Sequence, residues 1–219
     1  AATAGEASLF YSLGVAQPLM QAVKYDNKAV KYSSSIAIGK AEPVNKFAER
    51  HLVVENLAGA LKSSPGDKGL QNKWSEDTYP LRAAKVINNL AATRNKVLDL
   101  KKILPSIIDV TYHENDQIKM LACDTLANFR EPKAQRAIAD MALDQQLTLD
   151  MRLDVFECLI ASAKKNGNML KDETVNGLYE ILSSQTADPK LKSAAASAYG
   201  ALNLPSEKVK NLILDQAKK

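Results

Sequence analysis

The sequence predicts an all-α fold, a right-handed α-α superhelix (solenoid) of about five to six repeats with two helices in each. Three observations predict it. The chain of 219 residues is 46% hydrophobic but only 5% aromatic, and its apolar content is mainly Ala and Leu, which are strong helix formers. It has only nine Gly and eight Pro, which argues against an all-β chain with many tight turns. The third observation is an internal repeat.

An aliphatic residue followed by a basic residue recurs along the chain. The pairs begin at Val30, Leu81, Ile118, Met151 and Leu191. The steps between them are 51, 37, 33 and 40 residues, and all but the first are close to the length of two stacked helices. Small residues cluster after these pairs, as in Ser33 to Ser35 and Ala194 to Ala196, and small residues let neighbouring helix axes approach closely.

A helix-breaking residue follows each pair at a similar distance. The breakers are Pro43, Asn95, Pro132, the pair Asn166-Gly167, and Pro205. Proline is tolerated in the first turn of a helix but not in its middle, so each breaker should end one helix and open the second of the pair.

The second helices have a helical period of their own. Residues 43–61 and 95–110 each place aliphatic side chains on one stripe, and Pro105 is expected to kink the latter helix. With an additional pair near the start, about 12 helices are expected.

An acidic residue precedes the basic residue by four or five positions in four copies, at Asp26, Asp77, Glu114 and Asp188. The order of acid, aliphatic-basic pair, small residues and proline turn resembles HEAT repeats, and in particular the PBS-lyase-type HEAT-like repeats of bacterial proteins, which are armadillo-like. The resemblance implies one HEAT-like repeat domain over residues 1–219, in which the acid and the base form a ladder between adjacent repeats. The alternative is an irregular helical bundle.

Residues 62–78, KSSPGDKGLQNKWSEDT, interrupt the period as a polar insertion and contain the only tryptophan, Trp74. Insertions in helical repeats map to loops, often on a binding face, and an exposed Trp is a common contact residue. The alternative is that Trp74 folds back over an apolar edge of the protein. Apolar residues near the start, Leu9 to Tyr11, also lead us to expect a segment of a longer chain or packing against another domain.

No constellation of catalytic or metal-ligating residues is recognisable. The two histidines, His51 and His113, stand alone, without a second His or Cys at a ligand spacing. The chain has no nucleophile elbow and no glycine-rich phosphate loop. Ser33 to Ser35 lack a recognisable base. We therefore expect a protein that is not an enzyme and has no cofactor.

Basic residues mark the predicted second helices. The candidate partner-binding residues are Lys46, Arg50, Lys101, Lys102 and Arg136, together with Trp74. The sequence predicts a protein-protein interaction scaffold that uses its concave face. A solvated helix face explains the same charges without any partner. A nucleic-acid-binding module that uses the basic stripe is the alternative function, although these helices have almost no aromatic residues on which bases could stack.

Cys123 and Cys158 fall within helical patterns and are interpreted as small buried hydrophobes, which slightly favours the reducing cytoplasm. The longest apolar runs are too short to cross a bilayer. The chain starts at Ala rather than Met, so a signal peptide that has been removed remains an open alternative.

Overall fold

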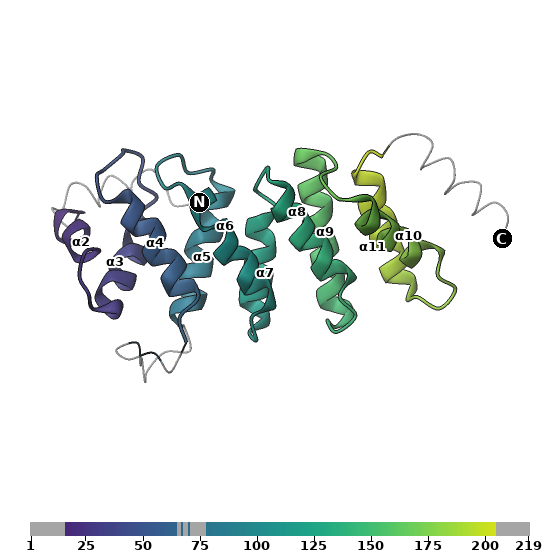
Figure 1. Cartoon of the computed structure of the whole chain (residues 1–219), viewed down its shortest axis with the longest axis horizontal. Helices are drawn as coiled ribbons and strands as arrows, with labels where there is room; N and C mark the ends of the chain where they lie inside the picture. The colour runs from purple at the N-terminus through teal and green to yellow at the C-terminus, as the bar shows by residue number, and fades with distance from the viewer. Residues whose placement is uncertain (1–15, 65–66, 68–69, 71–77, 205–219) are drawn as a thin grey trace. The chain divides into compact units, whose positions relative to one another are not determined.

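A computed structural model of the chain describes residues 16–64, 67, 70 and 78–204 (Figure 1). All regular secondary structure in this part is helical, as the sequence predicts. The α-helices are α2 (Ala16–Ala22), α3 (Lys28–Lys40), α4 (Arg50–Leu61), α5 (Tyr79–Ala92), α6 (Leu104–Asp109), α7 (Asp116–Leu126), α8 (Pro132–Leu143), α9 (Leu149–Asn166), α10 (Asp172–Ser183) and α11 (Pro189–Ala201). Two 3₁₀ turns, η1 (Leu100–Ile103) and η2 (Val110–Tyr112), flank α6. The fold is an all-α helical-repeat solenoid.

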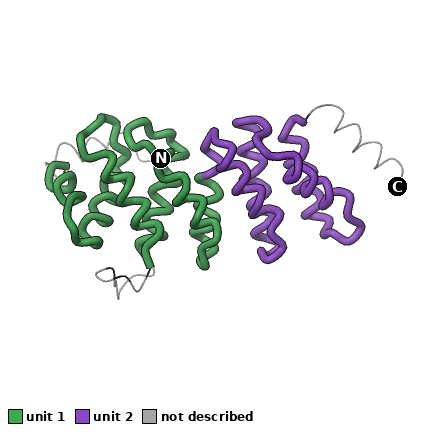
Figure 2. Tube along the Cα trace, in the orientation of Figure 1, with its two compact units in different colours: residues 1–125 green, residues 126–219 purple. Residues whose placement is uncertain are grey.

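The chain divides into two compact units, residues 1–125 and 126–219 (Figure 2). In unit 1, α3 packs against α4 and α5, and α4 packs against α5, η1 and α6. In unit 2, α9 packs against α8 and α11, and α10 packs against α8 and α11. Equivalent helices of adjacent pairs therefore contact each other, α3 with α5 and α4 with α6 in unit 1 and α8 with α10 and α9 with α11 in unit 2, as in stacked repeats.

The recurring aliphatic-basic pair marks the start of each first helix. In all five copies the backbone amide of the aliphatic residue donates to a side chain three residues earlier. These bonds join Val30 to Asn27 (3.1 Å), Leu81 to Thr78 (3.5 Å), Ile118 to Asn115 (3.1 Å), Met151 to Thr148 (3.3 Å) and Leu191 to Asp188 (3.4 Å). An N-cap of this kind satisfies one of the amides that a helix start leaves unpaired.

The aliphatic member of the pair also begins the core of its helix. Leu81, Ile118, Met151 and Leu191 are all buried. The core continues through fully buried side chains from both helices of the pairs, including Ile36, Ile38, Leu57, Leu90, Ile138 and Phe156. Cys123 and Cys158 are buried among them, as expected. No helix in the described part of the chain has both the length and the hydropathy needed to span a membrane.

The second helices of unit 1 are shorter than the periodicity predicts. Helix α4 begins at Arg50 rather than near Pro43, and Val44, which was assigned to its apolar stripe, is 70% exposed. Pro105 does not kink a long helix. It lies in the first turn of α6, after the 3₁₀ turn η1, because its missing N–H and fixed φ suit a helix start.

Most charges of the repeated motif with defined contacts act within their own helices; the exception is Arg152 of α9, which donates to the Ala142 carbonyl of α8 at 3.0 Å. The Lys119 ammonium pairs with Asp116 of the same helix at 3.0 Å, rather than with Glu114. The Arg82 guanidinium lies over the Tyr79 ring, 5.5 Å from its centroid. Asp188 caps α11. These contacts differ from the ladder between adjacent repeats that the resemblance implies.

Candidate functional site

Two loops lie side by side at the end of unit 1 that is uppermost in Figure 1: residues 41–49, which follow α3, and residues 93–99, which follow α5. The Asn95 side chain connects them. Its Nδ2 donates to the Pro43 carbonyl at 3.1 Å, and its Oδ1 accepts from the amides of Val97 (2.9 Å) and Leu98 (3.0 Å). The Asn89 amide group also donates to the Glu42 carboxylate. The two loops are thus fixed to each other.

Both loops turn through the left-handed region without a glycine. Glu42 has φ 46° and Arg94 has φ 53°, each two residues beyond the end of its helix. Asn203 takes the same conformation after α11, with φ 50°. A side chain with a Cβ is disfavoured there by roughly 1–2 kcal/mol. The helices therefore end in tight turns at some conformational cost.

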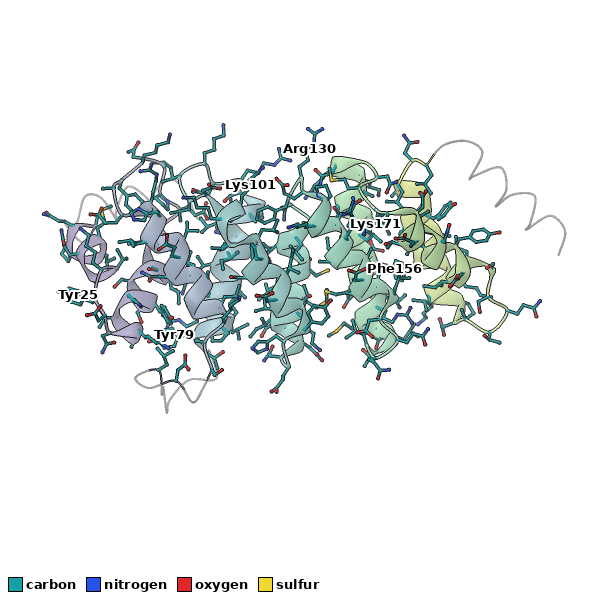
Figure 3. All side chains as sticks on the ribbon, viewed as in Figure 1. Tyr25, Tyr79, Lys101, Arg130, Phe156 and Lys171 are labelled. Atoms are coloured by element: carbon teal, nitrogen blue, oxygen red, sulfur yellow. The ribbon has the colours of Figure 1, made fainter. Side chains whose placement is uncertain are left out.

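Basic side chains gather around these two loops. We call this surface the basic end of unit 1 and define it by seven exposed residues: Lys40, Lys46, Arg50, Arg94, Lys96, Lys101 and Lys102. Lys101 lies at the upper edge of unit 1 in Figure 3. Because η1 packs against α4, Lys101 and Lys102 come to the same end as Lys46 and Arg50.

The acids at the basic end are engaged in contacts within unit 1. Glu42 accepts from Asn89, and the Asp99 carboxylate accepts from the Lys101 amide at 3.3 Å. Glu49 pairs with Lys24 at 2.8 Å. The hydrogen bond from Lys24, with a smaller contribution from a backbone amide, lowers the pKa of Glu49 below its usual value. Of these acids only Glu49 is paired with a cation, while Glu42 and Asp99 keep their charge, so the seven cations of the basic end still outnumber the carboxylates beside them.

Among the described residues, three lysines at the opposite end of unit 1 form ion pairs. Lys28 pairs with Asp67 at 3.2 Å, Lys62 with Asp109, and Lys119 with Asp116. Tyr79, which holds the Arg82 guanidinium against its ring, marks this end at the lower edge of unit 1 in Figure 3. These lysines therefore each lie beside a carboxylate of the described residues.

Arg136 lies in unit 2, on α8, and is half-buried. Its Nε donates to the Met169 carbonyl at 3.3 Å, so part of its guanidinium supports the loop before α10. Burial raises the pKa of the nearby Asp140 carboxyl, and the charges of Arg136 and Lys171 partly oppose that shift. The exposed residues Arg130 and Lys171 belong to the same unit (Figure 3).

Unit 2 also contains an open groove of about 700 Å³ between the α8–α9 loop and the α10–α11 loop. Aliphatic side chains such as Leu143 and Ile181 line it together with Arg152 and Glu180. The Arg152 Nε donates to the Ala142 carbonyl at 3.0 Å. Burial lowers the pKa of Arg152, and the Asp144 charge partly offsets this. The groove has neither a dominant charge nor a dominant apolar character.

The histidines make local contacts. The Nδ1 atom of His51 lies 3.1 Å from the Ala48 carbonyl oxygen, and that of His113 accepts from the Asn115 amide at 2.9 Å. Within the described residues, no group of three or more His, Cys, Asp or Glu side chains could hold a metal ion.

Four of the six predicted site residues, Lys46, Arg50, Lys101 and Lys102, meet at the basic end. Arg136 belongs to unit 2, and Trp74 lies outside the described residues. Sequence reasoning missed Lys40 and Arg94. Lys40 is the last residue of α3, three positions before Pro43, and Arg94 directly precedes Asn95, so closeness to the breakers is the signal that could have identified them.

No protein-family model matches the chain, and no curated protein matches it. Solved structures do resemble it. A crystal structure of an engineered protein has a TM-score of 0.54 at 13% identity and covers 91% of this chain and 84% of its own. A designed armadillo repeat protein has a TM-score of 0.50 at 15% identity, with coverages of 90% and 86%. A crystal structure of a second engineered protein has a TM-score of 0.51 at 15% identity and covers 91% of this chain and 86% of its own. These similarities support a repeat-type fold.

Proposed function

We propose that the protein is a non-catalytic scaffold that binds a segment of a partner protein, and that its repeats are of the PBS-lyase-type HEAT-like class within a single repeat domain. One observation carries the functional proposal. The basic end of unit 1 holds seven exposed cations, while the acids beside them make contacts within the unit. Packing of the helices does not require this excess charge, and it supports binding of a partner.

The candidate contacts are Lys46, Arg50, Lys101 and Lys102 at the basic end, with Arg136 and Trp74 as further contacts elsewhere on the chain. Lysine and arginine on fixed loops steer and orient a charged partner more than they add raw affinity. The fixed geometry comes from the Asn95 side chain, which bonds to the Pro43 carbonyl. A partner segment would therefore meet a surface that is already formed.

Nucleic acid is the second candidate, because exposed cations also bind phosphates. One observation disfavours it. The strongly exposed apolar side chain at the basic end is the aliphatic Val44, whereas sequence-tolerant binding of single strands depends on aromatic stacking. Phe47, in the same loop, is half-buried.

Selection of a displayed library of random 16-residue peptides against the chain tests the proposal. We expect enrichment of peptides that bind in solution and that labelled duplex DNA does not displace at moderate salt. A library that yields no enriched peptide would contradict the proposal. So would binding confined to duplex DNA, with an affinity that falls steeply as salt rises.

A further inference from the structure

We infer that the basic end of unit 1 docks a partner segment that is acidic and also carries an aliphatic side chain, which packs on Val44. The inference rests on the proposed function and adds the chemistry of the partner. It depends on three features of the described residues: a local excess of exposed cations over carboxylates, an exposed aliphatic side chain among them, and a hydrogen bond that joins the two loops.

The charge of the surface selects an anion. Lys40, Lys46, Lys96 and Lys102 are exposed and come from two consecutive repeats. Lys46 and Lys96 lie on the loops joined by the Asn95–Pro43 hydrogen bond, whereas Lys40 ends α3 and Lys102 lies in η1. The nearby carboxylates of Glu42 and Glu49 are already held by Asn89 and Lys24. At physiological salt, charges interact over roughly 8 Å, so clustered cations act together on a chain that passes over them.

The Val44 side chain argues for a protein segment. It is 70% exposed, and it follows Pro43, whose carbonyl is fixed by Asn95. The other large apolar side chains with comparable exposure in the described part of the chain, Tyr25 and Tyr112, lie outside these two loops. An exposed aliphatic group on a fixed backbone gains by being covered with another apolar group. Phosphates and sugars would leave it without such a contact.

The start of α4 adds a polar contribution. Helix α4 begins at Arg50, and its N-cap residue, Glu49, makes no side-chain capping bond. The first amides of a helix lack partners within it, and the positive end of its dipole disfavours a nearby cation such as Arg50. An acidic side chain from a partner would neutralise Arg50 at this position.

The experiment compares the peptides enriched on three proteins. The first is the unaltered chain. The second carries Lys46→Gln, Lys96→Gln and Lys102→Gln. The third is a matched control with Lys28→Gln, Lys62→Gln and Lys119→Gln at the opposite end of unit 1, so that both variants lose the same net charge. Circular dichroism verifies that each variant is folded.

We expect the peptides enriched on the unaltered chain to combine acidic and aliphatic residues. Their affinity should fall about tenfold or more in the basic-end variant and less than about twofold in the control. Val44→Ser should weaken binding by about threefold while leaving its salt dependence unchanged.

Enriched peptides without an acidic bias, or equal losses in the two triple variants, would overturn the inference but leave the proposed function standing. If the enriched acidic peptides bind the Val44→Ser variant with unchanged affinity, the assignment of an aliphatic contact is overturned. Absence of any enriched peptide would contradict the proposed function itself.

Discussion

The two ends of unit 1 both carry lysines and arginines but differ in the contacts that these residues make. At one end, Lys28, Lys62 and Lys119 pair with carboxylates. At the basic end, the carboxylates Glu42 and Glu49 are engaged elsewhere and the cations remain exposed. Total charge therefore says little about where a partner binds, since the formal net charge of the chain is only +4. The informative quantity is whether each charge has a partner within the fold.

The largest effect should come from removing the side chain that joins the two loops of the basic end. Asn95→Ala loses three hydrogen bonds, to Pro43, Val97 and Leu98, and we expect the free energy of unfolding to fall by about 2–3 kcal/mol. Urea denaturation measures this.

The matched control is Asn166→Ala in unit 2, because Asn166 is the last residue of α9 and donates to the Phe129 carbonyl at 3.1 Å. Because this variant loses a single hydrogen bond, its free energy of unfolding should fall by only about 1 kcal/mol. Equal decreases in the free energy of unfolding in the two variants would show that the hydrogen bonds of Asn95 stabilise the fold no more than the single bond of Asn166 does.

A smaller effect of opposite sign is expected at Arg94. Arg94→Gly relieves a left-handed backbone and should raise the free energy of unfolding by about 1 kcal/mol, which corresponds to roughly 2–4 °C in Tm. The same change removes one cation from the basic end and should weaken binding of acidic peptides. Thermal denaturation and peptide titration on one sample separate the two effects. A drop in Tm would indicate that the Arg94 side chain stabilises the fold.

The smallest effect concerns the ion pair between Lys24 and Glu49. Because the folded-state pKa of Glu49 lies below the ordinary value of 4.5, its carboxylate favours the native state above about pH 4.5, and this contribution is lost as the pH falls through the lowered pKa. Lys24→Met should return the pKa of Glu49 towards its ordinary value. Carbon-13 NMR titration of the carboxyl group measures the shift. An unchanged titration would mean that Lys24 is not its main cause.

Periodicity in the sequence predicted the helical-repeat fold because its signal is distributed over many residues. The steps between Val30, Leu81, Ile118, Met151 and Leu191 locate five first helices, and the breakers Asn95 and Asn166 lie where α5 and α9 end. The capping residues were missed, although Asn27, Thr78 and Thr148 each stand three positions before an aliphatic residue.

The candidate site was predictable only in part, because it depends on contacts between repeats. Lys46 and Lys101 belong to different repeats, and no local pattern states that their loops lie together. Periodicity also started the second helix at Pro43, seven residues before α4 begins, and so placed Val44 on its apolar stripe. The left-handed turns at Glu42 and Arg94 occur without glycine, and the sequence therefore contains no marker for them.

The five caps at the starts of the first helices have a consequence for how the chain acquires its structure. Each of these bonds spans three residues, so nucleation of a first helix needs no distant part of the chain. The packing that follows joins neighbouring pairs and keeps contact order low, which favours rapid folding. During synthesis on the ribosome, the helix pairs can therefore fold one after another, and each folded pair provides the apolar surface against which the next pair packs.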